Sequence, residues 1–246
     1  MRRAAGLLTL AAALLTAASL ASAAELAVGS GAALDLGTGS LDLGCADLNV
    51  AGTLSAGSVG FGAARDVAIA PAGVVNGDSG TLALSGDWSN AGSFNAGTSS
   101  VQISDGCGLL SGAVSGSTSF ASLSITSSSS RQVNFAAGST TTVTGGLTLA
   151  GQSGALLAIR STLGGSAAFL QALGAQLVQF VDVEDNDATG GNPITLGPES
   201  VTGTNTPGWQ FAPPVPVLGV FGLLALALGL LWRGQRVLGA GIASRG

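Results

Sequence analysis

Short runs of alternating residues fill the chain between residues 25 and 212, and turn residues end every run. In SLDLG, LNV, VAIA, LALS, VQIS and LSIT an apolar residue returns at every second position, which is the period of a strand with one buried face. Gly, Asn, Asp and Ser separate the runs and favour turns there. The one helix-like stretch, GGSAAFLQALGAQLVQF, continues into LVQFVDVED, which alternates as strands do. The pattern predicts an all-β domain.

The size of the side chains separates two all-β architectures. A β-sandwich uses antiparallel strands of about five or six residues around a core that is usually rich in aromatic residues, whereas aromatic residues make up 4% of this chain. Closely spaced runs of small aliphatic residues favour a β-solenoid, whose coils stack strand on strand. We therefore expect a right-handed parallel β-helix with irregular coils over residues 24–211, and a β-sandwich is the alternative.

The N-terminal segment has the three parts of a secretory signal peptide. Arg2 and Arg3 are basic, Gly6 to Leu20 is apolar, and Ala21-Ser22-Ala23 is a small-x-small cleavage box. We expect residues 1–23 to be a signal peptide, so that the mature chain starts near Glu25.

The C-terminal segment has the length and composition of a membrane span. Residues 215–232 contain no ionisable side chain, and a helix of this length covers about 27 Å, close to the hydrocarbon thickness of a bilayer. A Pro-rich spacer, residues 212–216, precedes it, and Arg233 and Arg236 follow as a basic stop. The positive-inside rule then places residues 233–246 in the cytoplasm and the larger part of the chain outside it.

The sequence PVPVLGVFG before this helix resembles the IPTL-CTERM sorting signal of Gram-negative bacteria, which is related to PEP-CTERM. Pro216 and Leu218 match the Pro and Leu of that motif, and Phe221-Gly222 matches its aromatic-Gly pair. Val217 departs from the Thr of the motif. The resemblance implies recognition by a membrane sorting enzyme, and the alternative is a plain single-pass anchor.

A second resemblance covers most of residues 51–209. The order GDWSNAGSFNAGTSSVQISDG, GSTSFASLSI, VNFAAGSTTTVTGGLTLAG, LLAIRSTLGGSAAFL, VDVEDNDATGGNPIT and TGTNTPGW is similar to that of β-helical stalks in secreted bacterial repeat proteins. It implies a structural, matrix or adhesin-like surface protein with extracellular polysaccharide or another surface as its partner. It also implies core or stacking roles for four aromatic residues, Trp88, Phe94, Phe120 and Phe135.

The composition excludes several kinds of chemistry. The chain has no His and no Lys, which removes Ser-His-Asp and Cys-His catalysis, Ser-Lys dyads and imidazole-ligated zinc. Three arginines and thirteen acidic residues lie between residues 25 and 212 and give this region a formal charge of −10. Such a surface cannot displace counterions from nucleic acid. We therefore expect no nucleic-acid partner.

Carboxylate chemistry remains, and we expect no enzymatic activity and no cofactor. A glycan-acting enzyme on a β-helix is the alternative from another class. Arg131 and Arg160 are the only candidate bases in its central coils, and we expect both to cap coil edges or to balance the acidic surface.

A short acidic segment and two cysteines complete the candidate sites. VDVEDNDATGG gathers four carboxylates, Asp182, Glu184, Asp185 and Asp187, which makes a calcium-stabilised binding module an alternative function. Leu196 stands where an EF-hand loop would have its twelfth-position Glu. Cys45 and Cys107 are the only cysteines, and in an exported protein such a pair is expected to form a disulfide.

Overall fold

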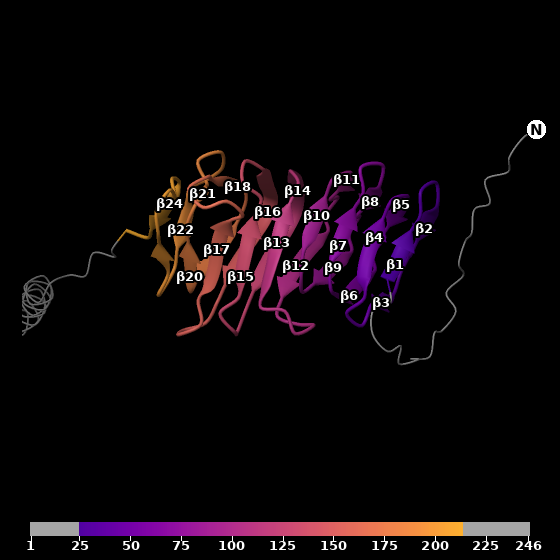
Figure 1. Ribbon diagram of the computed structural model, residues 1–246, viewed down its shortest axis with the longest axis horizontal. Coiled ribbons are helices and arrows are strands. Elements are labelled where there is room, and N and C mark those ends of the chain that lie inside the picture. The colour runs from indigo at the N-terminus through magenta and orange to yellow at the C-terminus, as the bar shows by residue number, and fades with distance from the viewer. Residues whose placement is uncertain (1–24, 214–246) are drawn as a thin grey trace, which may run out of the picture. The chain divides into compact units, whose positions relative to one another are not determined.

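The alternating runs become the strands of a parallel solenoid (Figure 1). The computed structural model describes residues 25–213, which form β-strands joined by short turns and contain no α-helix in that range. The paired strands run parallel to their neighbours on every face, as the coils of a solenoid do. The predicted parallel β-solenoid is confirmed over residues 25–202. The alternative β-sandwich is wrong, because a sandwich is built from antiparallel sheets. The hand of the coil stays a prediction.

The strands stack on three faces. The first face consists of β1 (Glu25–Val28), β4 (Asp47–Val50), β7 (Val67–Ile69), β10 (Trp88–Asn90), β13 (Ser111–Ser115), β15 (Gln132–Phe135), β17 (Leu157–Ser161), β20 (Val181–Val183) and β23 (Val201–Thr202). The second face begins with β2 (Ala33–Asp35), β5 (Thr53–Ser55), β8 (Val74–Asn76) and β11 (Ser93–Asn95). The third face begins with β3 (Ser40–Asp42), β6 (Gly60–Ala64), β9 (Thr81–Leu84) and β12 (Ser100–Ser104).

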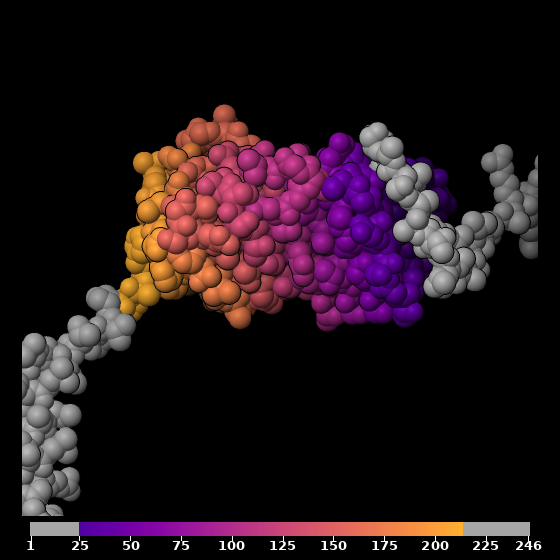
Figure 2. Space-filling model, turned by 90° about the horizontal axis from the view of Figure 1, so that it is seen from below, coloured from indigo at the N-terminus to yellow at the C-terminus, as the bar shows by residue number. Residues whose placement is uncertain are grey.

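In the central coils the second and third faces share long strands. These are β14 (Thr118–Thr126) and β16 (Thr140–Ala150), whose pairing shifts register between Phe120 and Ser122. On β16 pack β18 (Ala168–Ala172) and β19 (Gln176–Gln179), β21 (Asn186–Asp187) pairs with β18, and β22 (Ile194–Leu196) pairs with β24 (Trp209–Phe211). The space-filling view shows the coils following one another in chain order along one column (Figure 2).

Inward residues stack on the same position of the next coil. On the first face, Val67 pairs with Trp88, Trp88 with Val114, and Val114 with Phe135. All four side chains are buried, and burying a large apolar side chain contributes about 1.5–3 kcal/mol. Such ladders explain why the sequence alternates, since every second residue has to fill the interior.

Aromatic rings fill the interior where the strands lengthen. The Trp88 ring lies 4.9 Å from Phe94 and 5.1 Å from Phe120, centroid to centroid, with edge-to-face angles of 78° and 62°. The indole N–H of Trp88 donates to Thr118 Oγ1 at 3.3 Å. Phe135 is also fully buried. The predicted core roles of these aromatic residues are confirmed.

The two ends of the chain lie outside the described residues. The predicted signal peptide falls within residues 1–24, and the predicted membrane segment falls within residues 214–246. Within residues 25–213 no helix is long and apolar enough to cross a membrane. The compact unit that contains the solenoid ends at Phe211, and a second unit starts at Ala212.

Candidate functional site

A long loop stands at the corner where the chain passes from the third face back to the first. It spans residues 105–110 between β12 and β13, and Gly106 pairs with Leu109 across it. Cys107 lies in this loop and forms a disulfide with Cys45, 62 residues earlier, with a Cα–Cα distance of 5.6 Å. The predicted disulfide is confirmed. Cys45 precedes β4 and Cys107 follows β12, so the bond staples coils that are not neighbours in the stack.

The loop folds back over the preceding corner, where a glycine makes room for it. A Cβ atom on Gly86 would lie 1.9 Å from Asp66 Oδ1 and 3.0 Å from Leu109 Cδ1. The main-chain oxygen of Arg65 lies 2.8 Å from the same position, so any side chain at residue 86 would force the corner carboxylate and the main chain to shift.

Arg131 holds the same loop from inside. Its guanidinium is fully buried and donates to four main-chain oxygens, those of Ser85, Ser104, Leu109 and Ser111. Burial lowers the pKa of Arg131 below its ordinary value, while the nearby carboxylates of Asp105 and Asp87 oppose that shift. The group therefore ties three coils to the loop, and it is not available as a base to a substrate in solvent.

Asp105 is the carboxylate at this corner. Its Oδ2 accepts hydrogen bonds from Ser128 N at 2.7 Å and from Ser129 Oγ at 2.8 Å. Its Oδ1 is buried without a protein partner. Burial raises the pKa of Asp105, but the hydrogen bonds from residues 127–129 lower it, and the pKa lies below its ordinary value of 3.8. Asp105 is thus held ionised.

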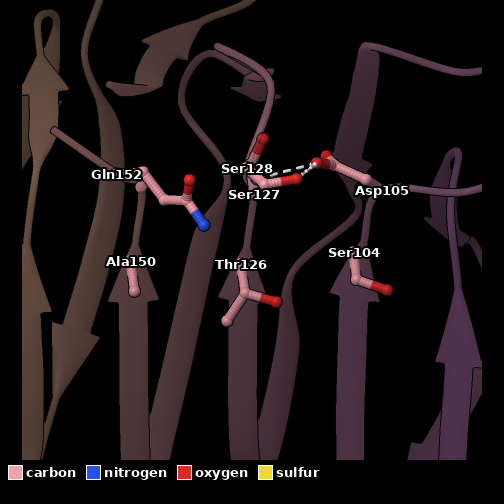
Figure 3. A pocket seen from close by; sticks show the side chains of 8 residues that line it. Ser104, Asp105, Thr126, Ser127, Ser128, Ala150 and Gln152 are labelled. Carbon is pink, nitrogen blue, oxygen red and sulfur yellow. Dashed lines mark hydrogen bonds between the residues drawn. The ribbon is translucent and has the colours of Figure 1, made fainter. Parts of the chain in front are cut away.

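Two hollows flank Asp105 along the corner. The larger has a volume of about 330 Å³ and lies at the ends of β12, β14 and β16, as Figure 3 shows. Its lining is Ser104, Asp105, Thr126, Ser127, Ser128, Ala150, Gly151 and Gln152. The smaller, of about 230 Å³, adjoins the disulfide. The larger lining holds one carboxylate, hydroxyl groups and one amide. Such a surface can hydrogen-bond a hydroxyl-bearing ligand, but its lining lacks the second carboxylate that glycoside hydrolysis needs.

Other acidic residues of the first coils also link adjacent corners. Asp66 Oδ1 accepts a hydrogen bond from Asp87 N at 2.7 Å, and Asp87 Oδ1 accepts one from Ala113 N at 2.8 Å. On another edge Asp78 Oδ2 accepts from Gly57 N at 3.0 Å. These carboxylates satisfy main-chain N–H groups that the stacked strands leave unpaired.

The structure disperses the four candidate calcium ligands. Asp182 forms an ion pair with Arg160 at 2.5 Å, and Glu184 lies 3.7 Å from the same guanidinium. The chain turns at Asp185, where φ is 52°. The amide of Gly165 and the side chain of Asn205 bind this carboxylate and lower its pKa.

Asp187 lies beyond that turn. It accepts hydrogen bonds from the N–H and the hydroxyl of Thr189, at 2.8 and 2.6 Å. Within residues 25–213 no three acidic or cysteine side chains are grouped as metal ligands would be. All four carboxylates of the acidic segment thus have protein partners.

The predicted sorting motif, Pro216, Leu218, Phe221 and Gly222, lies outside the described residues, and so do the basic stop residues Arg233 and Arg236. Sequence reasoning missed the corner around Asp105. The serine run SITSSSS, residues 124–130, was the available signal, because a run of hydroxyls after a strand provides donors for a nearby carboxylate.

The described residues define an all-β parallel solenoid stapled by a disulfide. Comparison with protein-family models, with curated proteins and with solved structures finds no match for this chain. The disulfide is consistent with an oxidising, extracytoplasmic location.

Proposed function

We propose that this chain is a non-enzymatic, exported protein of a Gram-negative cell envelope, with a solenoid that acts as a structural, matrix or adhesin-like module. The observation that carries the proposal is the Cys45–Cys107 disulfide across distant coils, because such a bond persists in oxidising compartments. The predicted signal peptide, residues 1–23, agrees with that location.

The remaining titratable groups support a non-enzymatic role. Arg131 is buried beneath main-chain oxygens, and Arg160 is paired with Asp182. The carboxylates at the corners and in the acidic segment accept hydrogen bonds from the protein itself. These contacts favour structure over a glycan-acting enzyme or a calcium-stabilised module. The hydroxyl-lined hollow beside Asp105 suits an extracellular polysaccharide as a partner.

The second part of the proposal concerns the C-terminal segment. Residues 215–232 serve as a membrane helix within a sorting signal, and a membrane sorting enzyme recognises Pro216, Leu218 and the pair Phe221-Gly222. The test is the intact mass of the mature protein, in membrane and released fractions, from a Gram-negative host that has the native sorting machinery. We expect a new C-terminus between residues 216 and 222. A full-length tail retained in the inner membrane would mean a plain anchor.

A matched pair of variants separates motif recognition from simple insertion. Pro216→Ala alters the motif, whereas Pro213→Ala changes a proline of the spacer that lies outside it. We expect Pro216→Ala to accumulate the full-length form, while Pro213→Ala is processed as the wild type. Equal processing of the two variants would reject the motif.

A further inference from the structure

The first coil leaves the N-terminal end of the solenoid open. β1, β2 and β3 are the terminal strands of their sheets, so each has one unpaired edge. Their inward leucines pack on the core but stay partly exposed; they are Leu26, Leu34, Leu36, Leu41 and Leu43. In the second coil the paired positions Leu48, Leu54 and Phe61 are buried. In the first coil Val28 is buried, but these leucines leave part of the interior exposed that later coils cover.

The opposite end of the column also has strands with one unpaired edge, β23 and β24, and exposed apolar side chains, Val201 and Phe211, but it contains a buried aromatic ring that the first coil lacks. Trp209 in the last coil is only 8% exposed, and its indole N–H donates to Asn186 Oδ1 at 3.2 Å. The chain also continues from β24 through Ala212. A second molecule that stacked head-to-tail on this end would have to accommodate that continuing chain.

We infer that the open end binds the open end of a second copy of this chain, related by a two-fold axis. On the proposed export route residues 1–23 are removed, so the mature chain has no long N-terminal segment to cover the leucines; this step rests on the proposed function. A solenoid end without a polar cap exposes its core and its strand edges. A two-fold interface needs a surface that is complementary to itself.

The sequence of the edge strands has that self-complementarity. A two-fold axis across the end pairs strands antiparallel, and inward residues must face inward residues. β2 is ALD and β3 is SLD, so Leu34 lies opposite Leu41 of the second copy. In that register each aspartate faces the neutral first residue of the opposite strand, Ala33 or Ser40. The acidic rim therefore does not place like charges in direct opposition, which would be destabilising.

The same rule sets the register of β1, whose sequence is ELAV with Leu26 and Val28 pointing inward. Leu26 then faces Val28 of the second copy, and Ala27 lies on the two-fold axis opposite its own equivalent. Nine strands on the first face, stacked at about 4.8 Å, make each column about 40 Å long. The dimer thus places the C-terminal ends of its two solenoids at opposite poles.

The position of Ala27 gives a sharp test, because one cysteine there should cross-link to itself. Ala27 and Ala68 belong to the same ladder, both paired with Asn49, but Ala68 lies within the stack. The native cysteines are already paired. In detergent-purified mature protein under mild oxidation, we expect Ala27→Cys to form a covalent dimer and Ala68→Cys to remain without an intermolecular cross-link. Equal cross-linking of the two variants would overturn the interface.

Sedimentation velocity supplies the second measurement. The wild type should sediment as a dimer whose population falls on dilution, and Leu41→Arg should make it monomeric. The control Leu177→Arg changes a side chain that is 53% exposed in a later coil and should remain dimeric. A wild type that is monomeric at every concentration, or that forms species larger than the dimer, would overturn the inference.

The N-terminal mass is measured on the same samples, which separates the two proposals. A chain that starts near Glu25 and is monomeric rejects the dimer while export stands. A chain that keeps residues 1–23 rejects the export proposal, and the dimer is then judged on protein made to begin at Glu25.

Discussion

The first coil and the coils around Trp88 follow the same sequence pattern, but their inward side chains are buried to different extents. In both, every second residue points inward. Around Trp88 the inward side chains meet neighbours above and below, and Trp88 and Phe120 are fully buried. In the first coil Leu34 and Leu41 have a neighbour on one side only and remain partly exposed. Stability in a solenoid is therefore a nearest-neighbour property, and the same substitution should cost more in the middle than at the end.

The largest expected effect is at the aromatic cluster. Trp88→Ala removes a ring that contacts Phe94 and Phe120 and leaves a cavity, so we expect the free energy of unfolding to fall by about 3–5 kcal/mol. Denaturant unfolding followed by circular dichroism measures it. The control Ser89→Ala alters the next, outward-facing residue of β10 and should cost much less. Equal losses of unfolding free energy in the two variants would show that the buried ring stabilises the solenoid no more than an outward-facing side chain does.

Removal of the Cys45–Cys107 disulfide should cause the second-largest loss of stability. The double variant Cys45→Ser with Cys107→Ser opens a loop of 62 residues, and the chain-entropy model gives a loss of about 4 kcal/mol, with measured values often nearer 2–4. The effect should be concentrated in the coils between the two cysteines. Hydrogen exchange would show faster exchange in residues 47–104 than in residues 132–183. A uniform change along the column would contradict this local role.

The difference in burial between the first coil and the coils around Trp88 also shows what the sequence could predict. Alternation identified the inward residues, since position within a strand is a local property. The disulfide followed from an even cysteine count in a chain predicted to be exported. Neither the alternation nor the cysteine count shows which coils stack on each other. That stacking determines burial: Leu34 stays partly exposed, whereas Leu82 is fully buried.

The corner around Asp105 could not be predicted for the same reason. The guanidinium of Arg131 binds the main-chain oxygens of Ser85 and Leu109, which are 46 and 22 positions away in sequence. Main-chain acceptors leave no residue-type signal, so the sequence shows only an isolated arginine. The acidic segment at residues 182–187 suggested a cluster, but the turn at Asp185 and the arginine at residue 160 give each carboxylate its own partner.

Substitution of the two central arginines compares the stabilising effect of a buried guanidinium with that of a partly exposed one. Arg131→Met leaves buried carbonyl oxygens without a donor, so we expect a loss of about 1–3 kcal/mol. Arg160→Met breaks an ion pair whose arginine side chain is 23% exposed, and such pairs near the surface contribute about 1 kcal/mol or less. Thermal melting of both variants at neutral pH makes the comparison. A larger loss of stability for Arg160→Met would mean that Arg131 is not the main stabilising residue of the corner around Asp105.

Asp105 should give the central coils a dependence on pH. Its pKa in the folded protein lies below the ordinary value of 3.8, so its contribution is present at higher pH and is lost as pH falls through the folded-state pKa. Asp105→Asn should cost about 1 kcal/mol at neutral pH, because the carboxylate accepts hydrogen bonds from Ser128 and Ser129. The difference from wild type should shrink below pH 3.8. A difference that does not change with pH would exclude the charge as its source.

The smallest effect should occur at the open end, and its size should depend on protein concentration. Leu34 is packed on one side only, so in the monomer Leu34→Ala should cost about 1 kcal/mol, well below the 2–5 kcal/mol of a fully buried leucine. If a second copy covers the leucines, the same substitution also weakens the dimer. The loss measured by melting should then grow as the protein is concentrated, since association stabilises the folded state by mass action. Leu82→Ala, in the buried ladder of the third face, should show a large loss with no such growth. A cost at Leu34 that stays the same from dilute to concentrated protein would mean that nothing covers the first coil in solution.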